Sequence, residues 1–330
     1  SKEPTAAMKA LADPYDPAQN GAARLGDASY FKGHYYLYFS AAPAFVLHWP
    51  YHALTGRELS TTTAVAWYAL TGFFAASALW LAIRRSYFPD SAAWVGAAGV
   101  LMLGLGTNLL VLARRPLVWE LPIAAAFAFA MLALLAVFWA LHGRRPVIAL
   151  GAAGFFYGLA IASRPGELFG AVLFLPVIWA AWKRGQGSTR DGKQWFWGGI
   201  AAAVGIGVWL LAVFAHNYAR FGDPLEFGVN YQLTSSYESK QQHFSLTYMA
   251  HNALIYLFHP AKWSAGFPFI ATSAVPGGPA GYLGTWVEPM AGLWVTFPFL
   301  WFGLAAPLAW WRHGEGRDDE ATRKFRTMLA

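Results

Sequence analysis

The chain has 330 residues, of which 57% are hydrophobic and 12% carry a charge. So few charged residues cannot cover a soluble globule of this length, and the composition therefore favours a membrane protein. The absence of cysteine excludes disulfides, thiolate metal sites and a cysteine nucleophile.

Seven apolar runs, each 17 to 25 residues long, divide the chain. A helix needs about 20 apolar residues to cross roughly 30 Å of hydrocarbon, and these runs have that length. The sequence therefore predicts an all-α polytopic membrane protein with about seven transmembrane helices. The runs are 62–83, 92–113, 117–141, 146–163, 166–182, 195–215 and 289–311.

The segments that join these runs must alternate between the two faces of a membrane, and their charges are uneven. One face holds 13 basic and six acidic residues, a net charge of +7, and the other holds 11 of each, a net charge of zero. Lys and Arg gather in cytoplasmic loops, so we predict that the basic face is cytoplasmic. The orientation in the membrane then explains the whole positive net charge of the chain. This charge therefore gives no reason to expect a nucleic-acid partner.

This orientation places the first residue and two long segments outside the cytoplasm. We expect one transmembrane domain over 1–311, with a first external loop at 1–60 that carries an interfacial helix and a larger one at 216–288. Residues 312–330 form a cytoplasmic connector or tail. Nothing in 1–30 resembles a signal peptide, so further helices are expected beyond one or both ends of the chain.

The first external loop has two parts. Residues 1–26 are polar, and Asp13-Pro14-Tyr15-Asp16-Pro17 has turn chemistry, because each proline biases its neighbour away from helix. Residues 27–58 are rich in Tyr and Phe and are interrupted by Pro43 and Pro50. This part is predicted to be an interfacial or partly re-entrant element, which a membrane tolerates only where protein or a wet cavity satisfies its backbone.

Two helical hairpins are predicted in the middle of the chain, turning at Arg114-Arg115-Pro116 and at Arg164-Pro165. The apolar stretch 146–182 would be about 55 Å long as one helix at roughly 1.5 Å per residue, which is longer than a bilayer requires. It must therefore fold back, and Arg164-Pro165 is its only polar break.

The larger external loop opens with a turn-rich segment at 216–224. Residues 246–258 alternate polar and apolar side chains at roughly helical spacing, which indicates a helix that lies on the membrane surface. Pro276-Gly277-Gly278-Pro279 is predicted to be a flexible loop before the last run.

Four arginines are predicted to lie outside, near the bilayer, where the positive-inside rule disfavours cations: Arg114, Arg115, Arg164 and Arg220. Ionisable groups at membrane depth are costly and often mark a functional pathway. Converging guanidinium groups would suit a phosphate, whose oxygens they bind bidentately. The alternative is that each arginine reaches lipid headgroups or pairs with a nearby carboxylate, such as Glu120 or Glu167.

Three carboxylates of the first external loop are candidates for the general base, or the anchor, of an acceptor hydroxyl: Asp27, Asp13 and Asp16. Asp13 and Asp16 stand beside prolines and are equally explained as turn formers. Asp27 precedes the aromatic cluster without such a turn, so it is the first candidate. Four further residues are predicted to line the cavity or the acceptor site: Glu120, Tyr35, Tyr36 and Tyr38.

Motifs that would bind a metal or a nucleotide are incomplete or lacking in this sequence. His48 and His52 are four residues apart, but Pro50 lies between them and no third ligand is evident, so interfacial packing is the better interpretation. No Walker loop, GxSxG elbow or HExxH motif occurs in a credible context. No cofactor is predicted, although a divalent cation is left open.

Four blocks of the sequence resemble bacterial membrane glycosyltransferases of the GT-C superfamily, the group that includes protein mannosyltransferases and the aminoarabinose transferase. The first block is DPYDP followed by GDASYFKGHYYLYFSAAPAFVLHWPYHALTG, which is similar to their first extracytoplasmic loop. The others are LGTNLLVLARRPLVWELPIAAAFAF, GLAIASRPGELFGAVLFLPVIW and NYARFGDPLEFGVNYQL. Together the blocks span roughly 11–235, in matching order.

The resemblance implies an inverting transferase in a bacterial inner membrane, which takes a sugar from a polyprenyl-phosphate donor on the extracytoplasmic face. It also implies a catalytic acidic residue in the first external loop, which maps best to Asp27, with Asp13 or Asp16 as alternates. Basic residues near the donor phosphate map to Arg164 and to Arg114 or Arg115.

Two departures from this family leave a second hypothesis open. Residues 1–60 lack the Asp-Glu pair that is typical of the mannosyltransferases, and the helix that normally precedes this loop is missing. The alternative is a non-catalytic subunit that packs against other integral membrane proteins in a larger complex. Transport is disfavoured, because none of the seven runs carries a charged residue in its middle.

Overall fold

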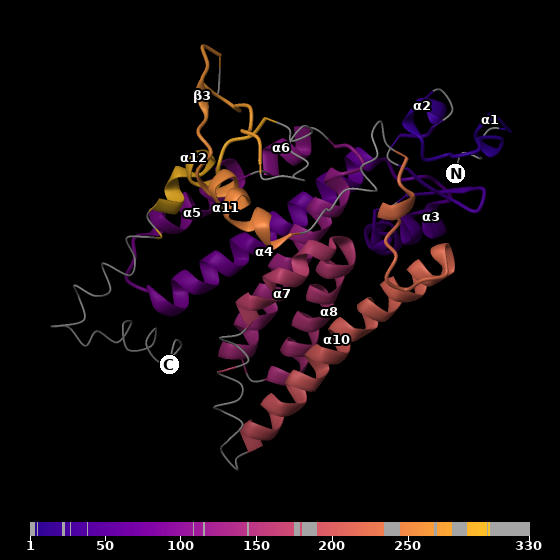
Figure 1. Cartoon of the computed structure of the whole chain (residues 1–330). Helices are drawn as coiled ribbons and strands as arrows, with labels where there is room; N and C mark the ends of the chain where they lie inside the picture. Colours follow the sequence, from indigo (N-terminus) through magenta and orange to yellow (C-terminus); the bar gives the residue numbers. More distant parts are fainter. Residues whose placement is uncertain are drawn as a thin grey trace. The chain divides into compact units, whose positions relative to one another are not determined.

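The computed structural model describes most of the chain as two compact units (Figure 1). The described part of unit 1 lies in Asp27–Val229, and that of unit 2 lies in Pro4–Gly26 and Asn230–Asp318. Each unit is described on its own. The residues outside the description are 1–3, 5, 22–23, 27, 38, 108, 115, 144, 175–178, 180–189, 234–244, 267–268, 279–288, 302 and 304–330.

Unit 1 contains four helices that are long and apolar enough to cross a membrane. They are α4 (Thr61–Tyr87), α7 (Glu120–His142), α8 (Pro146–Ser163) and α10 (Arg190–Phe221). These helices confirm four of the seven predicted runs, as expected of a helical membrane protein. The predicted break at Arg164-Pro165 is also confirmed, because α8 ends at Ser163.

The predicted span at 92–113 is two shorter helices. Helix α5 (Ala93–Leu105) has 13 residues, fewer than the roughly 20 that a crossing needs. Thr107 follows the end of α5, and its Oγ1 donates to the Leu103 carbonyl at 2.7 Å. The chain then begins a separate helix, α6 (Leu109–Arg114).

The two remaining runs are described only in part. The run at 166–182 begins as a 3-10 helix, η2 (Pro165–Phe174), and most of its remainder lies outside the described residues. The described part of 289–311 contains the short helices α12 (Leu293–Thr296) and η7 (Pro298–Leu300). A total of seven spans therefore stays a prediction.

The contacts within unit 1 fix the directions of its long helices. Helices α4 and α7 run parallel, because Gly72 faces Phe127 at one level and the Tyr87 hydroxyl meets His142 Nε2 at 2.8 Å further along. Helix α8 returns antiparallel to α7 after a short turn. Helices α8 and α10 are again parallel, since Gly154 faces Ala202 and Gly158 faces Ile206. The connection between Ser163 and Arg190 therefore joins opposite ends of this pair, the direction that a returning span would require.

These directions give the bundle of unit 1 two ends of different chemistry. One end, which we call the hairpin end, is defined by Thr61, Glu120, Ser163 and Phe221. The other, the basic end, is defined by Tyr87, His142, Pro146 and Arg190. Arg84, Arg85, Arg145 and Lys193 lie at the basic end. Arg114, Arg164 and Arg220 lie at the hairpin end, so three of the four singled-out arginines share one end of the bundle.

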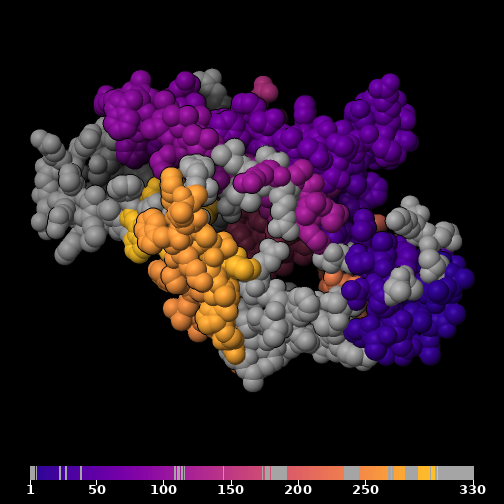
Figure 2. Space-filling model, turned by 90° about the horizontal axis from the view of Figure 1, so that it is seen from above, coloured from indigo at the N-terminus to yellow at the C-terminus, as the bar shows by residue number. Residues whose placement is uncertain are grey.

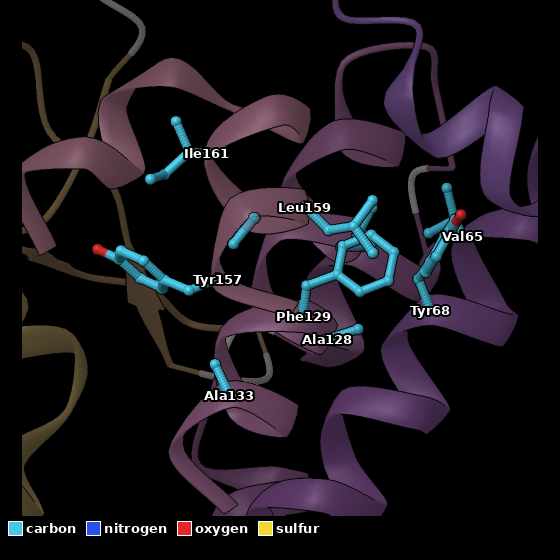
Figure 3. Close-up of a cluster of buried hydrophobic side chains, with 11 residues drawn as sticks. Val65, Tyr68, Ala128, Phe129, Ala133, Tyr157, Leu159 and Ile161 are labelled. Atoms are coloured by element: carbon cyan, nitrogen blue, oxygen red, sulfur yellow. The ribbon is translucent and has the colours of Figure 1, made fainter. Parts of the chain in front are cut away.

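The core of unit 1 lies between α4, α7 and α8 and is rich in alanine (Figure 3). Ala124, Ala125 and Ala128 have no exposed surface, which lets the helices approach closely, the packing expected of helices in lipid. The rings of Tyr68 and Phe129 meet edge to face, with centroids 5.5 Å apart. Tyr68 is also fixed by its hydroxyl, which donates to the Pro43 carbonyl at 2.8 Å.

A β-hairpin precedes the bundle where the sequence predicted an interfacial or re-entrant element, so the chain is not entirely α-helical. Strands β1 (Ala28–Phe31) and β2 (His34–Leu37) pair antiparallel, with Ala28 opposite Leu37. The turn residues Lys32 and Gly33 have φ angles of 47° and 82°. Two consecutive positive φ angles match the right-handed twist of a tight hairpin, which is why the strands close here.

The segment after this hairpin is helical despite its prolines. A π-helix, η1 (Ala44–His48), runs directly into α3 (Trp49–Thr55). Pro50 lies inside this continuous helical stretch, because His48 before α3 also has helical backbone angles, so its missing N–H removes one helical hydrogen bond just after the π-helix.

Helix α10 extends beyond the predicted boundary, and this corrects the interpretation of 216–221 as part of a turn-rich loop. The helix continues to Phe221 and ends at Gly222, whose φ angle is 76°. A glycine in this left-handed conformation terminates a helix at little steric cost. The backbone geometry of Gly222, and not the change from apolar to polar residues, therefore sets the end of α10.

Unit 2 is built from short elements. Before the bundle it contains α1 (Ala6–Lys9) and α2 (Pro17–Asn20). The later part contains η5 (Leu246–Tyr248), α11 (Met249–Phe258), β3 (Lys262–Trp263) and β4 (Ile270–Ala271). The predicted helix at 246–258 is confirmed as a helix, whereas its place on a membrane stays a prediction.

Candidate functional site

The hairpin end of unit 1 is assembled around the last turn of α10. The ring of Phe221 contacts Phe31 and Tyr36 of the β-hairpin, with centroids 5.7 and 5.4 Å apart. Ser29 Oγ donates to the Gly228 carbonyl at 2.7 Å, which ties the hairpin to the chain that follows α10. These contacts hold the residues next to Phe221 in fixed positions.

A cavity of about 70 Å³ lies beside this turn. Its walls come from the end of α8, from the segment that leads into η1 and from one face of α10. This volume has room for several water molecules, each of which needs roughly 10–15 Å³. The lining residues are Ser40, Ala41, Ala42, Phe45, Ala162, Pro165, Trp209, Ala212, Val213, His216, Asn217, Arg220 and Phe227.

The lining of the cavity changes from polar to apolar along α10. Trp209 and Arg220 are 11 residues apart, so the lining face of α10 extends over about 16 Å at roughly 1.5 Å per residue. His216 and Arg220 form a cationic or polar end, whereas Trp209 and Val213 form an apolar end. Phe45 also lines the cavity and is 55% exposed, so the cavity reaches the surface beside an apolar side chain.

Arg220 is the most unusual group in this cavity. Its guanidinium donates to the Leu37 carbonyl and to Asn217 Oδ1, both at 2.7 Å, and it packs over the Phe221 ring. The Nε atom is buried and has no hydrogen-bond partner. Within the part of the chain that the structure describes, no carboxylate forms an ion pair with Arg220. The nearby carboxylate of Glu226 attracts the guanidinium electrostatically without an ion-pair contact, so this half-buried positive charge is only partly compensated.

A second buried donor lacks a partner in the same cavity. Trp209 Nε1 is buried without a hydrogen bond to any described residue. The indole of Trp209 and the guanidinium of Arg220 both line the cavity, although the two unpaired nitrogen atoms are themselves buried. Both groups only donate, and one belongs to a cation, so an anion or another acceptor-rich group fits this site best.

The other predicted arginines are less enclosed. Arg164 is exposed, and its neighbour Pro165 lines the cavity, which places Arg164 at its rim. Arg114 is exposed at the end of α6 and does not line the cavity. Arg115 lies outside the described residues.

The predicted carboxylates do not meet at this cavity in the described parts of the chain. Asp13 and Asp16 belong to unit 2 and satisfy local backbone. Asp13 Oδ1 accepts from the Tyr15 amide at 2.9 Å, and Asp16 caps α2 by accepting from the Ala18 amide at 2.9 Å. These bonds are the turn-forming alternative that the sequence had left open. Asp27, the first candidate for a general base, lies outside the described residues.

The predicted lining residues are spread around the hairpin end. Tyr36 packs on Phe221, while Tyr35 faces Tyr30, with ring centroids 5.6 Å apart. Burial and the neighbouring Tyr30 raise the pKa of Tyr35, so its hydroxyl stays protonated at neutral pH. Glu120 begins α7 and does not line the cavity. Tyr38 lies outside the described residues.

Three cavity residues were not recognised as functional from the sequence: Trp209, His216 and Asn217. With Arg220 they recur at helical spacing on α10, and this periodicity was available in the sequence. It was hidden because the helix was expected to end at 215, before the polar half of the stripe.

No group of three or more metal-ligating side chains occurs in the described parts of the chain. His52 Nδ1 lies 3.3 Å from Glu58 Oε1 on the surface, in a pair that lacks a third ligand. Searches of family models, of curated proteins and of solved structures returned no match to this chain.

Proposed function

We propose that the chain is an integral membrane glycosyltransferase of a bacterial inner membrane, which binds a polyprenyl-phosphate-linked sugar in the Arg220 cavity. The sugar moves to an acceptor on the extracytoplasmic face, at the hairpin end. The observation that carries this proposal is the half-buried guanidinium of Arg220, which neutral acceptors hold in place and which lines a largely apolar cavity.

The charge of Arg220 favours a phosphate over a neutral ligand. The guanidinium is half-buried and only partly compensated by Glu226, so a bound anion that accepts its hydrogen bonds stabilises it further. Two of the guanidinium nitrogens are held by Leu37 and Asn217, so the group is oriented before a ligand binds. A preoriented cation can also stabilise the negative charge that develops on the departing lipid phosphate during sugar transfer.

The apolar end of the cavity favours a lipid over a free phosphate. From Arg220 the lining passes Val213 to Trp209, three turns along α10 and toward the middle of the bundle. Phe45, whose ring meets His216 edge to face with centroids 6.3 Å apart, is more than half exposed. An isoprenoid chain can follow this apolar wall into the membrane while its phosphate stays at Arg220.

The acceptor hydroxyl requires a base, and Asp27 is our candidate. It directly precedes β1, whose Ser29 and Phe31 are fixed at the hairpin end. Asp13 and Asp16 are the less suitable alternates, because their oxygens already accept backbone hydrogen bonds.

Replacing Asp27 with Asn is expected to lower sugar transfer by roughly 100-fold or more, since general base catalysis contributes about 10²–10⁴-fold. The measurement is the release of polyprenyl phosphate from radiolabelled polyprenyl-phosphate sugars in membranes. The Asp13→Asn variant is the matched control and should retain transfer. Normal transfer by a well-expressed Asp27→Asn protein would remove Asp27 from the mechanism.

A non-catalytic subunit is the second candidate, and the sequence supplies the observation that favours it. Residues 1–60 lack an Asp-Glu pair, and their first two aspartates form turn and capping bonds. Such a subunit would bind the lipid phosphate at Arg220 without transferring its sugar. Lipid binding without transfer, in a protein that purifies together with other integral membrane proteins, would select this candidate.

A further inference from the structure

Helix α11 in unit 2 exposes apolar side chains and partly buries polar ones, which is the reverse of an ordinary surface helix. Its exposed side chains are apolar and include Met249, at 66% exposed, and Leu254, at 65%. Its polar residues His251 and Asn252 are partly buried instead. Surface helices of soluble proteins bury their apolar stripe and expose their polar one, so α11 has the polarity of a helix that does not face water.

The exposed apolar face is broad. Met249, Ala250, Ala253 and Tyr256 are all exposed and recur at intervals of three or four residues, so they share one side of the helix. Leu246, just before α11, is 86% exposed. Tyr248 and Ile255 point the other way and are buried. We call this exposed side, with Leu246, the outward face of α11.

The neighbouring β3–β4 hairpin also exposes large apolar side chains. Trp263 in β3 is 88% exposed and follows Lys262, and Phe269 beside β4 is 54% exposed. Lys262 and Trp263 combine a cation with an amphipathic ring, the pair that is enriched where proteins meet lipid headgroups. The described residues of this segment form a continuous surface in Figure 2, coloured orange.

Charge identifies the partner of this surface. No Asp or Glu occurs from 239 to 287, while Lys262 lies at the hairpin. A surface without carboxylates is not repelled by anionic lipid headgroups. The later part of unit 2 begins at Asn230, nine residues after α10 ends at Phe221, so a short connection links it to the end of a predicted membrane span.

We propose that the outward face of α11 and the β3–β4 hairpin with Trp263 bind the surface of the lipid bilayer. Leu246, Met249 and Leu254 enter the boundary between headgroups and acyl chains, and Trp263 anchors the hairpin at headgroup level. Interfacial helices sink about 5–10 Å into this boundary. Binding of this surface to the bilayer does not require the proposed transferase activity.

The absence of cysteine gives a direct test in the full-length protein. Ala253→Cys places one thiol on the outward face of α11, and Ala18→Cys places one on exposed α2 of the same unit as the matched control. Each variant receives a nitroxide label and is reconstituted in vesicles that contain anionic phospholipid. The measurement is spin relaxation by oxygen, which partitions into lipid, and by a water-soluble nickel chelate.

The proposal predicts that the label at residue 253 is relaxed strongly by oxygen and weakly by nickel, whereas the label at residue 18 shows the reverse. Strong relaxation by nickel at residue 253 would place the face in water and overturn the proposal. Weak relaxation by both reagents would mean that protein covers the face, which overturns it equally. Sugar transfer by the two variants shows separately whether the proposed activity persists.

Discussion

Replacing Arg220 with Gln is expected to weaken the binding of polyprenyl phosphate by roughly 30- to 150-fold, because a hydrogen bond to a charged group contributes about 2–3 kcal/mol. The Gln side chain removes the positive charge from the cavity, while keeping an amide that can still reach the polar neighbours of Arg220. Sugar transfer should fall at least as far, since the same charge would stabilise the leaving phosphate. Binding is measured with detergent-solubilised protein and a fluorescent polyprenyl phosphate.

Two controls separate this effect from misfolding. Arg114→Gln removes an exposed cation that does not line the cavity, so its binding should change less than about twofold. Arg220→Lys keeps the charge but loses the planar fork that reaches both the Leu37 carbonyl and Asn217 Oδ1, and should bind with intermediate affinity. Equal losses in the Arg114 and Arg220 variants would mean that only the net charge matters, contrary to the proposed site.

The second large effect is expected at Gly154, where α8 meets α10. A Cβ atom at this position would lie 2.1 Å from the Ala202 carbonyl oxygen and 2.4 Å from its Cα. Both are backbone atoms, so neither can move aside without separating the helices. Gly154→Val should therefore cost more than the roughly 1–3 kcal/mol of ordinary overpacking. Thermal unfolding in detergent should show a loss of roughly 10 °C or more, or no folded protein.

The matched control for Gly154 is Gly207 on α10, because nothing lies within 4 Å of a Cβ built there. Gly207→Val carries the same change of residue in a membrane helix and should leave the unfolding temperature within a few degrees. Because α8 and α10 both supply walls of the Arg220 cavity, Gly154→Val should also abolish lipid binding. Similar unfolding temperatures for the two variants would contradict the close contact of α8 with α10.

Hydropathy predicted the helices that are apolar over a full crossing and failed where a helix ends inside an apolar run. The runs that became α4, α7, α8 and α10 are uniformly apolar over a full crossing. The run at 92–113 is equally apolar, but α5 ends before Gly106, and Gly104 and Gly106 both lower the helix propensity of this stretch. A window average cannot detect such a break, because glycine weakens a helix without making the run polar.

The candidate site was predictable in part. The charge pattern placed Arg164 and Arg220 on one side, and the structure brings both to the hairpin end. It did not separate the enclosed Arg220 from the exposed Arg164, because enclosure depends on which residues η1 and α8 bring beside α10.

The β-hairpin at 28–37 was missed for a different reason. Its turn depends on positive φ angles at Lys32 and Gly33, and a Lys-Gly pair is a weak turn signal beside so many aromatic residues.

The most direct test of a lipid phosphate in the Arg220 cavity is the position of a photo-crosslink. A polyprenyl phosphate with a photoreactive group close to its phosphate is mixed with the purified protein and irradiated, and the labelled residues are mapped by mass spectrometry. We expect labelling on α10 between Trp209 and Arg220 or on the segment from Ser40 to Phe45, and none there with the corresponding uncharged polyprenol. Labelling confined to other parts of the chain, or equal labelling by the polyprenol, would contradict the proposal.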